Sequence, residues 1–403
     1  MREGWTKKTI GEIAELISRG RAPAYCENDG LLVVNQKCIR DGRINFELAR
    51  RTDSKKKPIP DWAILRVGDA LINSTGVGTL GRASLVSRLG ELTTFDSHVT
   101  LVRPNPVLCD PFFIGLFLNS CENEIELFGG GSTGQTELSR EAVSNFSIVL
   151  PPVCEQRRIV DLMSSVDSYI AALQQKADAA RSARSAVLSE LLAAGGDGWT
   201  ETTLGEVLAI QSGFAFSTSD WTVKGYPVIK INNVRDGKVS TESCSFIADP
   251  IPQGAEKFLL KKGDLLITLT GEIGATGTVE QNFPMYLNQR VGRVSIHKES
   301  KVLLQYLAVL FNYPPVRAEM WSLGKGNAQL NISPKSIHEI EVNLPPLSEQ
   351  RWTIEIISSM DEVIRSTEQA VVDAKNLRSG LLSDLLSGDH EIPGSYDRLL
   401  GAA

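Results

Sequence analysis

Leu150-Pro-Pro-Val-Cys-Glu-Gln-Arg157 recurs as Leu344-Pro-Pro-Leu-Ser-Glu-Gln-Arg351, 194 residues further along the chain. A second pair of segments keeps the same offset, because Gly4-Trp5 with Thr9-Ile10-Gly11-Glu12 returns as Gly198-Trp199 with Thr203-Leu204-Gly205-Glu206. An internal duplication of this kind predicts two similar halves related by an approximate two-fold axis.

Each copy of the proline motif is followed by a long stretch with apolar residues at alternating spacings of four and three. The positions, which hold mainly apolar side chains, are 159, 163, 166, 170, 173, 177, 180, 187 and 191, and then 353, 357, 360, 364, 367, 371, 374, 381 and 385. Arg184 and Arg378 interrupt the two patterns at the same place. The periodicity predicts two coiled-coil helices that pair with each other, although two amphipathic helices packed separately on their own domains would give a similar pattern.

The direction of the helices follows from their length. The 38 residues from Glu155 to Leu192 form a helix of about 57 Å. A domain of some 150 residues has a diameter of roughly 40 Å, so it spans that length poorly. Antiparallel pairing removes the difficulty, because the second helix then returns the chain to its starting end.

Short β-branched runs separated by Gly, Asn and Asp fill the two large segments. Leu31–Val34 corresponds to Tyr226–Ile231, and Val67–Ile72 corresponds to Lys262–Ile267. A short helix is expected in each segment, at about 111–127 and 302–322. We therefore predict an α+β chain with pseudo-two-fold symmetry, in which two α/β domains lie at opposite ends of an antiparallel two-helix coiled coil. The expected parts are domains at 1–150 and 195–346, helices at 151–194 and 347–388, and a tail at 389–403.

Composition excludes few classes of partner. The net charge is −6, yet the segments 1–150 and 198–346 each contain equal numbers of acidic and basic side chains, so a basic face is compatible with both. The six cysteines form no Cys-x-x-Cys pair and are expected to be buried, reduced thiols. Without an apolar signal region or a run of 18 apolar residues, we expect a cytoplasmic protein with no membrane partner.

Sequence patterns typical of enzymes occur in the first half, but they do not recur at the corresponding positions of the second half. Gly76-Val-Gly-Thr-Leu-Gly81 fits a dinucleotide loop, but its counterpart Gly271–Gly277 has a different spacing, so a tight turn is the preferred interpretation. Gly130-Gly-Ser-Thr-Gly134 fits a nucleophile elbow, but its counterpart Gly324–Ala328 contains no serine. The four histidines are far apart in sequence, which disfavours a metal site. We predict a chain with no catalytic residues, cofactor or metal.

Polar and basic residues occupy equivalent loops in both halves. Arg and Lys suit guanine edges, Asn and Gln suit adenine edges, and hydroxyl groups suit phosphates. These residues are therefore candidates for binding DNA. In the first half they are Asn35, Gln36, Lys37, Arg40, Lys55, Lys56, Lys57, Asn73, Thr75, His98 and Gln135. In the second half they are Lys230, Asn232, Asn233, Arg235, Thr268, Thr270, Gln289, Arg290, Lys325, Asn327 and Gln329.

The arrangement resembles the DNA specificity subunit of type I restriction-modification systems. Both copies of Leu-Pro-Pro-x-x-Glu-Gln-Arg carry the resemblance, as do Phe258–Ile267 with Thr270-Gly271 and the looser copy Val67–Ile72. The resemblance covers nearly the whole chain. The halves differ where Asp96-Ser-His98 stands opposite Asn288-Gln-Arg290, so a contact in one half does not carry over to the other.

The resemblance implies a division of labour. The two domains would be target recognition domains, each reading one half of an asymmetric, bipartite sequence in double-stranded DNA, and the helices would set the spacing. Two modification subunits that hold S-adenosylmethionine would dock here, and restriction subunits that use ATP and Mg²⁺ would join them in defence against foreign DNA. Two alternatives remain: the specificity subunit of an orphan methyltransferase, and a coiled-coil protein scaffold that does not bind DNA.

Overall fold

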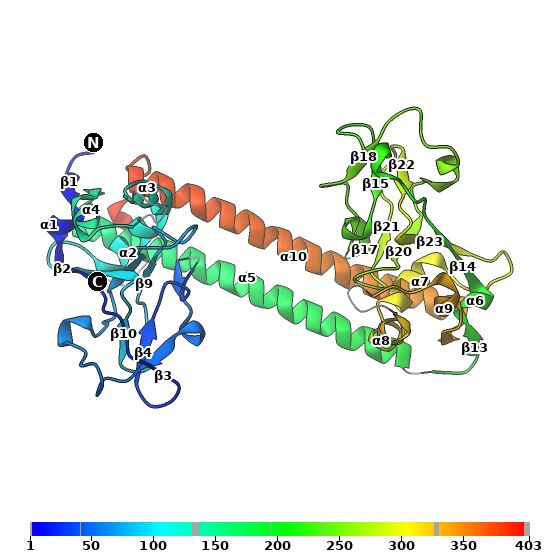
Figure 1. Ribbon diagram of the computed structural model, residues 1–403, viewed down its shortest axis with the longest axis horizontal. Coiled ribbons are helices and arrows are strands. Elements are labelled where there is room, and N and C mark those ends of the chain that lie inside the picture. The colour runs from blue at the N-terminus through cyan, green and yellow to red at the C-terminus, as the bar shows by residue number, and fades with distance from the viewer. Residues whose placement is uncertain are drawn as a thin grey trace. The chain divides into compact units, whose positions relative to one another are not determined.

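The computed structural model describes residues 2–40, 42–130, 137–193, 195–235, 237–325 and 330–398 (Figure 1). The chain divides into two compact units. Unit 1 comprises Met1–Leu173 and Ala370–Ala403, and unit 2 comprises Gln174–Gln369. Each unit contains one α/β domain, called domain 1 or domain 2, and about half of each of the two long helices.

Domain 1 is built from short strands and short helices. In chain order they are β1 (Thr6–Thr9), α1 (Ile10–Ile13), β2 (Ala14–Arg19), β3 (Tyr25–Cys26), β4 (Leu31–Val34), β5 (Ile39–Arg40), β6 (Arg43–Ile44), η1 (Phe46–Leu48), β7 (Arg50–Thr52), η2 (Asp61–Ala63), β8 (Ala70–Asn73), β9 (Ala83–Leu85), β10 (Thr93–Phe95), β11 (Val99–Pro104), α2 (Pro111–Ser120), α3 (Glu122–Leu127), α4 (Arg140–Asn145) and β12 (Ser147–Leu150). The long helix α5 (Val153–Ala193) follows.

Domain 2 has a similar order of elements. They are β13 (Thr200–Thr203), α6 (Leu204–Val207), β14 (Leu208–Ser212), η3 (Thr218–Asp220), β15 (Tyr226–Ile229), η4 (Ile231–Asn233), β16 (Val234–Arg235), β17 (Gly237–Val239), β18 (Ser245–Ile247), η5 (Ala255–Phe258), β19 (Leu259–Leu260), β20 (Leu265–Thr268), β21 (Thr276–Thr278), β22 (Met285–Leu287), β23 (Val291–Ile296), α7 (Leu304–Phe311), α8 (Pro314–Leu323), α9 (Pro334–His338) and β24 (Glu341–Leu344). The second long helix α10 (Leu347–Ser387) and η6 (Gly394–Arg398) end the described chain.

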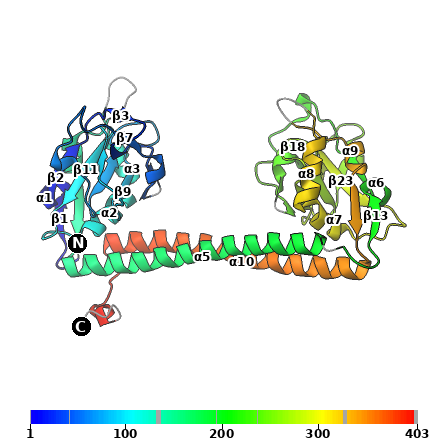
Figure 2. The ribbon, with the colours of Figure 1, turned by 90° about the horizontal axis from the view of Figure 1, so that it is seen from below.

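The sheets are mostly antiparallel, and most of their strands correspond between the domains. The strand order β2-β11-β8-β9 in domain 1 matches β14-β23-β20-β21 in domain 2, where β17 and β16 extend the sheet to six strands. A second sheet, β10-β4-β7-β3 in domain 1 and β18-β15-β22-β19 in domain 2, contains the parallel pairs β4–β10 and β15–β22. Within unit 1, the sheet with β3 and β7 lies away from the long helices (Figure 2).

Each domain packs its core onto the long helices of its own unit. In unit 1, Ile159 and Met163 of α5 and Leu385 of α10 join the core around α1, α2 and β8. In unit 2, Leu188 of α5 and Ile357 of α10 join the core around α6, α7 and β20. Burial of these large apolar side chains anchors each domain to the helices.

The halves of α5 and α10 within each unit are antiparallel, as expected. In unit 2, Arg184 pairs with Asp361, and Arg181, earlier on α5, pairs with Glu368, later on α10. The buried positions follow the predicted pattern as far as Ala177. Beyond Arg184 the most buried residues of α5 are Leu188 and Leu192, one position later than predicted, because this end of the helix faces domain 2.

The arginines that interrupt the periodicity form equivalent ion pairs. Arg184 Nε and Nη2 donate to the Asp361 carboxylate at 2.5 and 3.1 Å in unit 2. Arg378 Nε and Nη2 donate to the Asp167 carboxylate at 2.5 and 2.9 Å in unit 1. Both arginines and both aspartates are 194 residues apart, so the duplication has preserved one bidentate contact twice.

Two of the repeated sequence motifs meet at the start of each long helix. Trp5 Nε1 donates to Glu155 Oε2 at 3.1 Å, and Trp199 Nε1 donates to Glu349 Oε2 at the same distance. The Gly-Trp motif and the glutamate of the proline motif are therefore joined in space in both units. Pairing these two motifs from sequence would have required knowing that β1 lies beside β12 and β13 beside β24.

The glutamine of the proline motif is a buried structural residue. Gln156 Nε2 donates to the carbonyl of Pro151 at 2.7 Å, and Gln156 Oε1 accepts from the backbone amide of Asp110 at 2.7 Å. Gln350 repeats both bonds, with a proline carbonyl at 2.8 Å and a backbone amide at 2.9 Å. The side chain thus satisfies backbone groups where the domain joins the helix.

The repeated Thr-x-Gly-Glu motif caps a one-turn helix. The Thr9 amide donates to the Glu12 carboxylate at 2.6 Å, and the Glu12 amide donates to the Thr9 hydroxyl at 3.3 Å. Thr203 and Glu206 form the same capping box at the start of α6. This motif fixes the entry of the chain into each domain.

The shared Gly-Asp motif before β8 and β20 holds an arginine from the neighbouring strand. Gly68 and Gly263 adopt positive φ angles of 96° and 92°, which favour glycine. Asp69 Oδ1 and Oδ2 accept from Arg103 at 2.8 and 2.7 Å, and both side chains are buried. Arg293 approaches Asp264 only to 3.4 Å, and this pair is partly exposed. Both halves contain the motif, but its ion pair is shorter and more buried in domain 1 than in domain 2.

Two local expectations need correction, and one is confirmed. Each predicted short helix is two helices, α2 and α3 in domain 1 and α7 and α8 in domain 2, because the helix breaks near Cys121 and before Pro314. All six cysteines are free as expected, but only Cys38 and Cys109 are buried and Cys154 is exposed. Burial raises the pKa of the Cys109 thiol to about 12. Gly76–Gly81 forms a turn after β8, in agreement with the preferred interpretation.

Candidate nucleic-acid interface

Three polar segments of domain 1 meet where strands end. Asn35–Lys37 follows β4, Asn73–Thr75 spans the end of β8, and Asp96–His98 joins β10 to β11. Backbone bonds connect them, because the Asp96 amide donates to the Val34 carbonyl at 3.0 Å and the Ser74 amide donates to the His98 carbonyl at 2.8 Å. We call these three segments the strand-end cluster of domain 1. The structure thus brings together six of the predicted residues.

Side chains also link the three segments. Asn73 Nδ2 donates to the backbone carbonyl of Gln36 at 3.1 Å, and Thr75 Oγ1 donates to Gln36 Oε1 at 3.3 Å. Thr75 Oγ1 also lies 2.8 Å from His98 Nδ1. His98 is exposed, Gln36 and Thr75 are partly exposed, and Asn73 is buried with no hydrogen-bond partner for Oδ1 among the described residues.

The other predicted residues of domain 1 have different surroundings. Asn35 is buried and its Oδ1 accepts from the Lys37 amide at 2.9 Å, so it closes a turn. The side chains of Lys37 and Arg40 are exposed. The lysines at 55, 56 and 57 are exposed in the turn after β7, and Lys57 Nζ donates to the carbonyl of Ala22.

Domain 2 builds an equivalent strand-end cluster on the same backbone contacts. The Asn288 amide donates to the Ile229 carbonyl at 3.1 Å, and the Leu269 amide donates to the Arg290 carbonyl at 3.0 Å. In both domains the first residue of the connecting turn accepts from an amide two residues on, at 2.9 Å for Asp96 and 3.3 Å for Asn288. The positions match although the residues differ. Gln289 and Arg290 are exposed.

Several predicted residues of domain 2 serve the domain's own structure. Lys230 Nζ lies 3.8 Å from the ring centroid of Trp221 and donates to Ser245 Oγ at 2.7 Å, and burial lowers the pKa of this ammonium. Asn233 is buried; its Oδ1 accepts from the Lys230 amide at 3.0 Å. The neighbouring Asn232 is exposed.

The threonines of domain 2 also make internal contacts. Thr268 is buried, and its hydroxyl accepts from the Ala275 amide at 3.0 Å. Thr270 Oγ1 donates to Asn331 Oδ1 at 2.5 Å. Arg235, by contrast, is exposed at the end of β16.

One more loop meets the cluster in each domain. In domain 1, isolated bridges join Glu137 to Thr75 and to Gly130; in domain 2, Asn331 is joined in the same way to Thr270 and to Lys325. Lys325 is exposed. The predicted residues Gln135, Asn327 and Gln329 lie outside the described residues, as does Ser132 of the serine motif.

The structure adds residues that no motif had indicated. Arg19 forms an ion pair with Glu137, and its Nε donates to the Ser97 carbonyl at 2.6 Å. Tyr25 donates its hydroxyl to Asp96 Oδ2 at 3.3 Å. Burial raises the pKa of the Asp96 carboxyl, and the amide of His98 partly opposes this. These residues lie on β2 and β3, far from Asp96 in sequence, so only tertiary structure could connect them.

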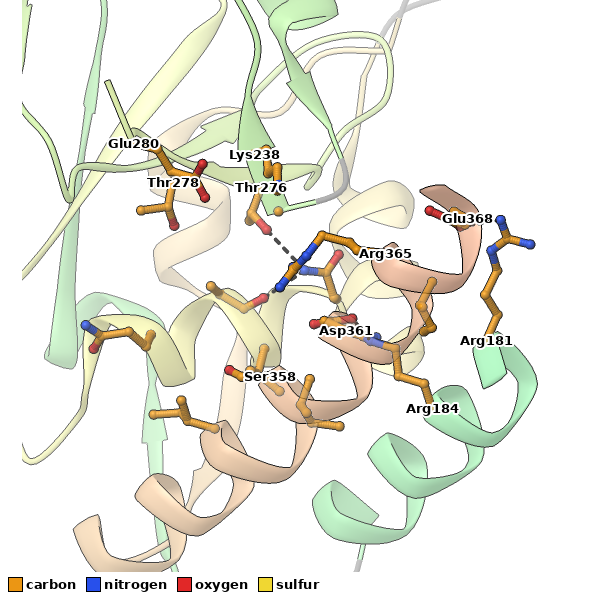
Figure 3. Close-up of a pocket in the computed structure, with 18 residues that line it drawn as sticks. Arg181, Arg184, Lys238, Thr276, Thr278, Glu280, Ser358, Asp361, Arg365 and Glu368 are labelled. Atoms are coloured by element: carbon orange, nitrogen blue, oxygen red, sulfur yellow. Dashed lines mark hydrogen bonds and ion pairs between the residues drawn. The ribbon is translucent and has the colours of Figure 1, made fainter. Parts of the chain in front are cut away.

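A separate cleft of about 560 Å³ opens in unit 2 between β17, β21, α7 and the long helices (Figure 3). None of the predicted DNA-binding residues lines it. Its arginines already face carboxylates, since Arg184 pairs with Asp361, Arg181 with Glu368, and Arg365 with Glu362. The strand-end clusters are therefore the better candidate for binding a polyanion.

The described ranges contain no group of three or more His, Cys, Asp or Glu side chains that could hold a metal ion. Nor does any helix in them combine the length and the apolar character needed to cross a bilayer.

Comparison with known proteins gives consistent results. Residues 2–180 and 196–373 match the family model described as "Type I restriction modification DNA specificity domain". The MjaVIII type I restriction enzyme specificity subunit of Methanocaldococcus jannaschii is 25% identical over 413 residues, which cover 96% of this chain and 93% of that protein. The EcoBI specificity subunit of Escherichia coli is 22% identical, covering 62% and 60%.

Solved structures share the fold. A structure described as showing complex assembly and conformational transition of a type I R-M system matches with a TM-score of 0.65 and 19% identity, over 96% of this chain and 99% of the other. The S subunit of a type I system from M. genitalium matches with a TM-score of 0.55 and 16% identity, over 95% and 96%. The expected fold class, with two α/β domains and two long packed helices, is confirmed.

Proposed function

The chain belongs to the family of type I restriction-modification DNA specificity domains, and we propose that each of its two domains reads one half of a bipartite target in double-stranded DNA. It is a DNA specificity subunit and, like the family, non-catalytic. The observation that carries the proposal is the pair of strand-end clusters: equivalent backbone contacts hold different side chains. Because His98 stands where domain 2 has Arg290, the two half-sites should differ in sequence.

Two modification subunits are the partners that the duplication favours. Arg157 and Arg351 of the proline motifs are exposed, and among the described residues neither has a hydrogen-bond or ion-pair partner. Tyr169 and Val363, also 194 residues apart, are 60% and 49% exposed on the long helices. Each unit thus presents the same exposed positions, and such apolar side chains suit a protein interface. On this proposal the modification subunits carry S-adenosylmethionine, and restriction subunits with ATP and Mg²⁺ complete the assembly.

Methylome sequencing of DNA modified by the assembled complex tests the function. We expect one asymmetric motif with two specified blocks separated by unspecified bases. Arg235→Ala should relax the block read by domain 2 only, with a loss of about 1–3 kcal/mol if a base contact is removed. A single continuous motif, or methylation without sequence preference, would contradict the proposal.

We further propose that the long helices set the spacing between the blocks. Removing residues 170–176 and 369–375, one heptad from each helix, shortens both by about 10 Å, which corresponds to about three base pairs. The heptad pattern is kept, so both blocks should remain readable with a shorter spacer. An unchanged spacer in methylome sequencing would rule out this role. Matched substitution of exposed residues without deletion, such as Lys375→Ala, is the control.

A further inference from the structure

We propose that Gln36, Thr75 and His98 form one hydrogen-bonded reader that recognises a single adenine in the half-site of domain 1. The proposal rests on the proposed DNA-reading function and adds the identity of the base. It follows from the direction of the hydrogen bonds in the strand-end cluster, from the rigidity of the three segments, and from the absence of the same set of side chains in domain 2.

The two contacts of the Thr75 hydroxyl together assign a direction to the hydrogen bonds. Gln36 Oε1 only accepts, so the single hydroxyl proton of Thr75 is donated to it across 3.3 Å. The Thr75 oxygen must then accept from His98, whose Nδ1 lies 2.8 Å away. A neutral histidine that carries its proton on Nδ1 has a lone pair on Nε2. In that neutral form, the exposed His98 ring presents an acceptor to solvent.

The remaining groups form a donor beside an acceptor. Gln36 Nε2 has no hydrogen-bond partner among the described residues and can donate, whereas His98 Nε2 can accept. In the major groove adenine presents N7 as an acceptor next to its N6 amino donor. Guanine presents two acceptors there, and thymine presents an acceptor and a methyl group. The pair of side chains complements adenine, with Gln36 facing N7 and His98 facing the amino group.

The reader is held in place before DNA binds. The Gln36 carbonyl accepts from Asn73 Nδ2 at 3.1 Å, and the His98 amide donates to Asp96 Oδ1 at 2.9 Å. The Ser74 amide, next to Thr75, donates to the His98 carbonyl at 2.8 Å. Segments fixed in this way lose little conformational entropy on binding, which favours specificity.

Domain 2 does not contain this reader. Ile231 occupies the position of Gln36, Arg290 occupies that of His98, and Thr270 donates to Asn331 instead. The second half-site is therefore an internal control for folding and assembly of the complex.

The test uses the full chain assembled with its modification subunits, and duplexes in which each adenine of the first half-site is replaced in turn. One series carries 7-deazaadenine, which lacks N7, and another carries purine, which lacks the 6-amino group. At one position, each analogue should weaken binding by wild type roughly 3- to 10-fold, the effect of one hydrogen bond. Gln36→Ala should abolish the effect of 7-deazaadenine alone, and His98→Ala the effect of purine alone.

Thr75 supplies the matched pair of variants. Thr75→Ser keeps the hydroxyl and should bind as wild type does, whereas Thr75→Val should lose both effects while the second half-site is read normally. The inference is overturned if wild type discriminates its target but no adenine shows this pattern, or if the variants change the requirement for a different base. If wild type shows no bipartite discrimination at all, the proposed function itself fails, and the two failures are thus distinguishable.

Discussion

Domain 1 and domain 2 share their backbone contacts more closely than their surface side chains. The same amide-to-carbonyl bonds join the strand ends in both, yet His98 is replaced by Arg290 and Gln36 by Ile231. At the start of the long helices the side chains themselves are repeated, as in the tryptophan–glutamate bonds of 3.1 Å in both units. The difference separates residues that maintain the fold from residues free to define a target.

The largest expected difference between the two domains is the contribution of the Gly-Asp ion pair to the free energy of unfolding. Asp69 and Arg103 have side chains 2% and 8% exposed, so Asp69→Ala leaves a buried, unpaired guanidinium and should cost about 3–5 kcal/mol. Asp264→Ala should cost only about 1 kcal/mol, because the Arg293 pair is longer and partly hydrated. Hydrogen exchange of the full chain, measured separately over β8 and β20, gives the two losses of stability. Equal losses would show that the difference in burial does not affect stability.

The two buried glutamines, by contrast, should contribute equally to stability. Gln156→Ala and Gln350→Ala each leave at least two backbone groups at the domain–helix junction without a partner, and each should cost about 2 kcal/mol. Urea unfolding of the full chain, with separate transitions assigned by tryptophan fluorescence, gives the two values. Arg157→Ala, at the neighbouring exposed position, is the control and should leave stability unchanged. A loss of stability in only one of the two variants would show that the two junctions are not equivalent.

The smallest effect is expected at the repeated ion pairs of the long helices. Arg184→Ala and Arg378→Ala should each cost about 0.5–1 kcal/mol, because the pairs are bidentate but partly hydrated. Exchanging the charges, as Arg184→Asp with Asp361→Arg, should recover most of the loss in thermal unfolding. Arg181→Ala removes a more exposed pair and should cause no measurable change. If the exchange recovers nothing, the contact does not contribute to helix pairing.

Local patterns were sufficient for most of the architecture. The heptad spacing predicted both long helices and their pairing, and their length predicted that they are antiparallel. The motif Thr-x-Gly-Glu marks a capping box that acts within four residues. The shift of the buried face from Val187 to Leu188 was not predictable, because it depends on packing against domain 2. The split of each short helix into two was missed although Pro314 signals a break.

The candidate interface was only partly predictable. Sequence placed Gln36, Thr75 and His98 on loops that correspond between the halves, but not that they share hydrogen bonds. It also gave no reason to separate exposed residues such as Arg235 from buried ones such as Asn233, since both follow a short strand. The difference depends on contacts formed by the fold, such as the hydrogen bond of 3.2 Å that Asn233 Nδ2 donates to the carbonyl of Glu242, nine residues further along the chain.

By itself, the sequence determined the duplication, the two long helices and the equivalence of the loops, because these depend on periodicity and on residues close together in the chain. Only the tertiary structure decided which side chains meet: the tryptophan with the glutamate 150 residues away, each interrupting arginine with an aspartate on the other helix, and the three residues of the adenine reader. Hydrogen bonds act over about 3 Å, so they depend on which strand ends the fold brings together.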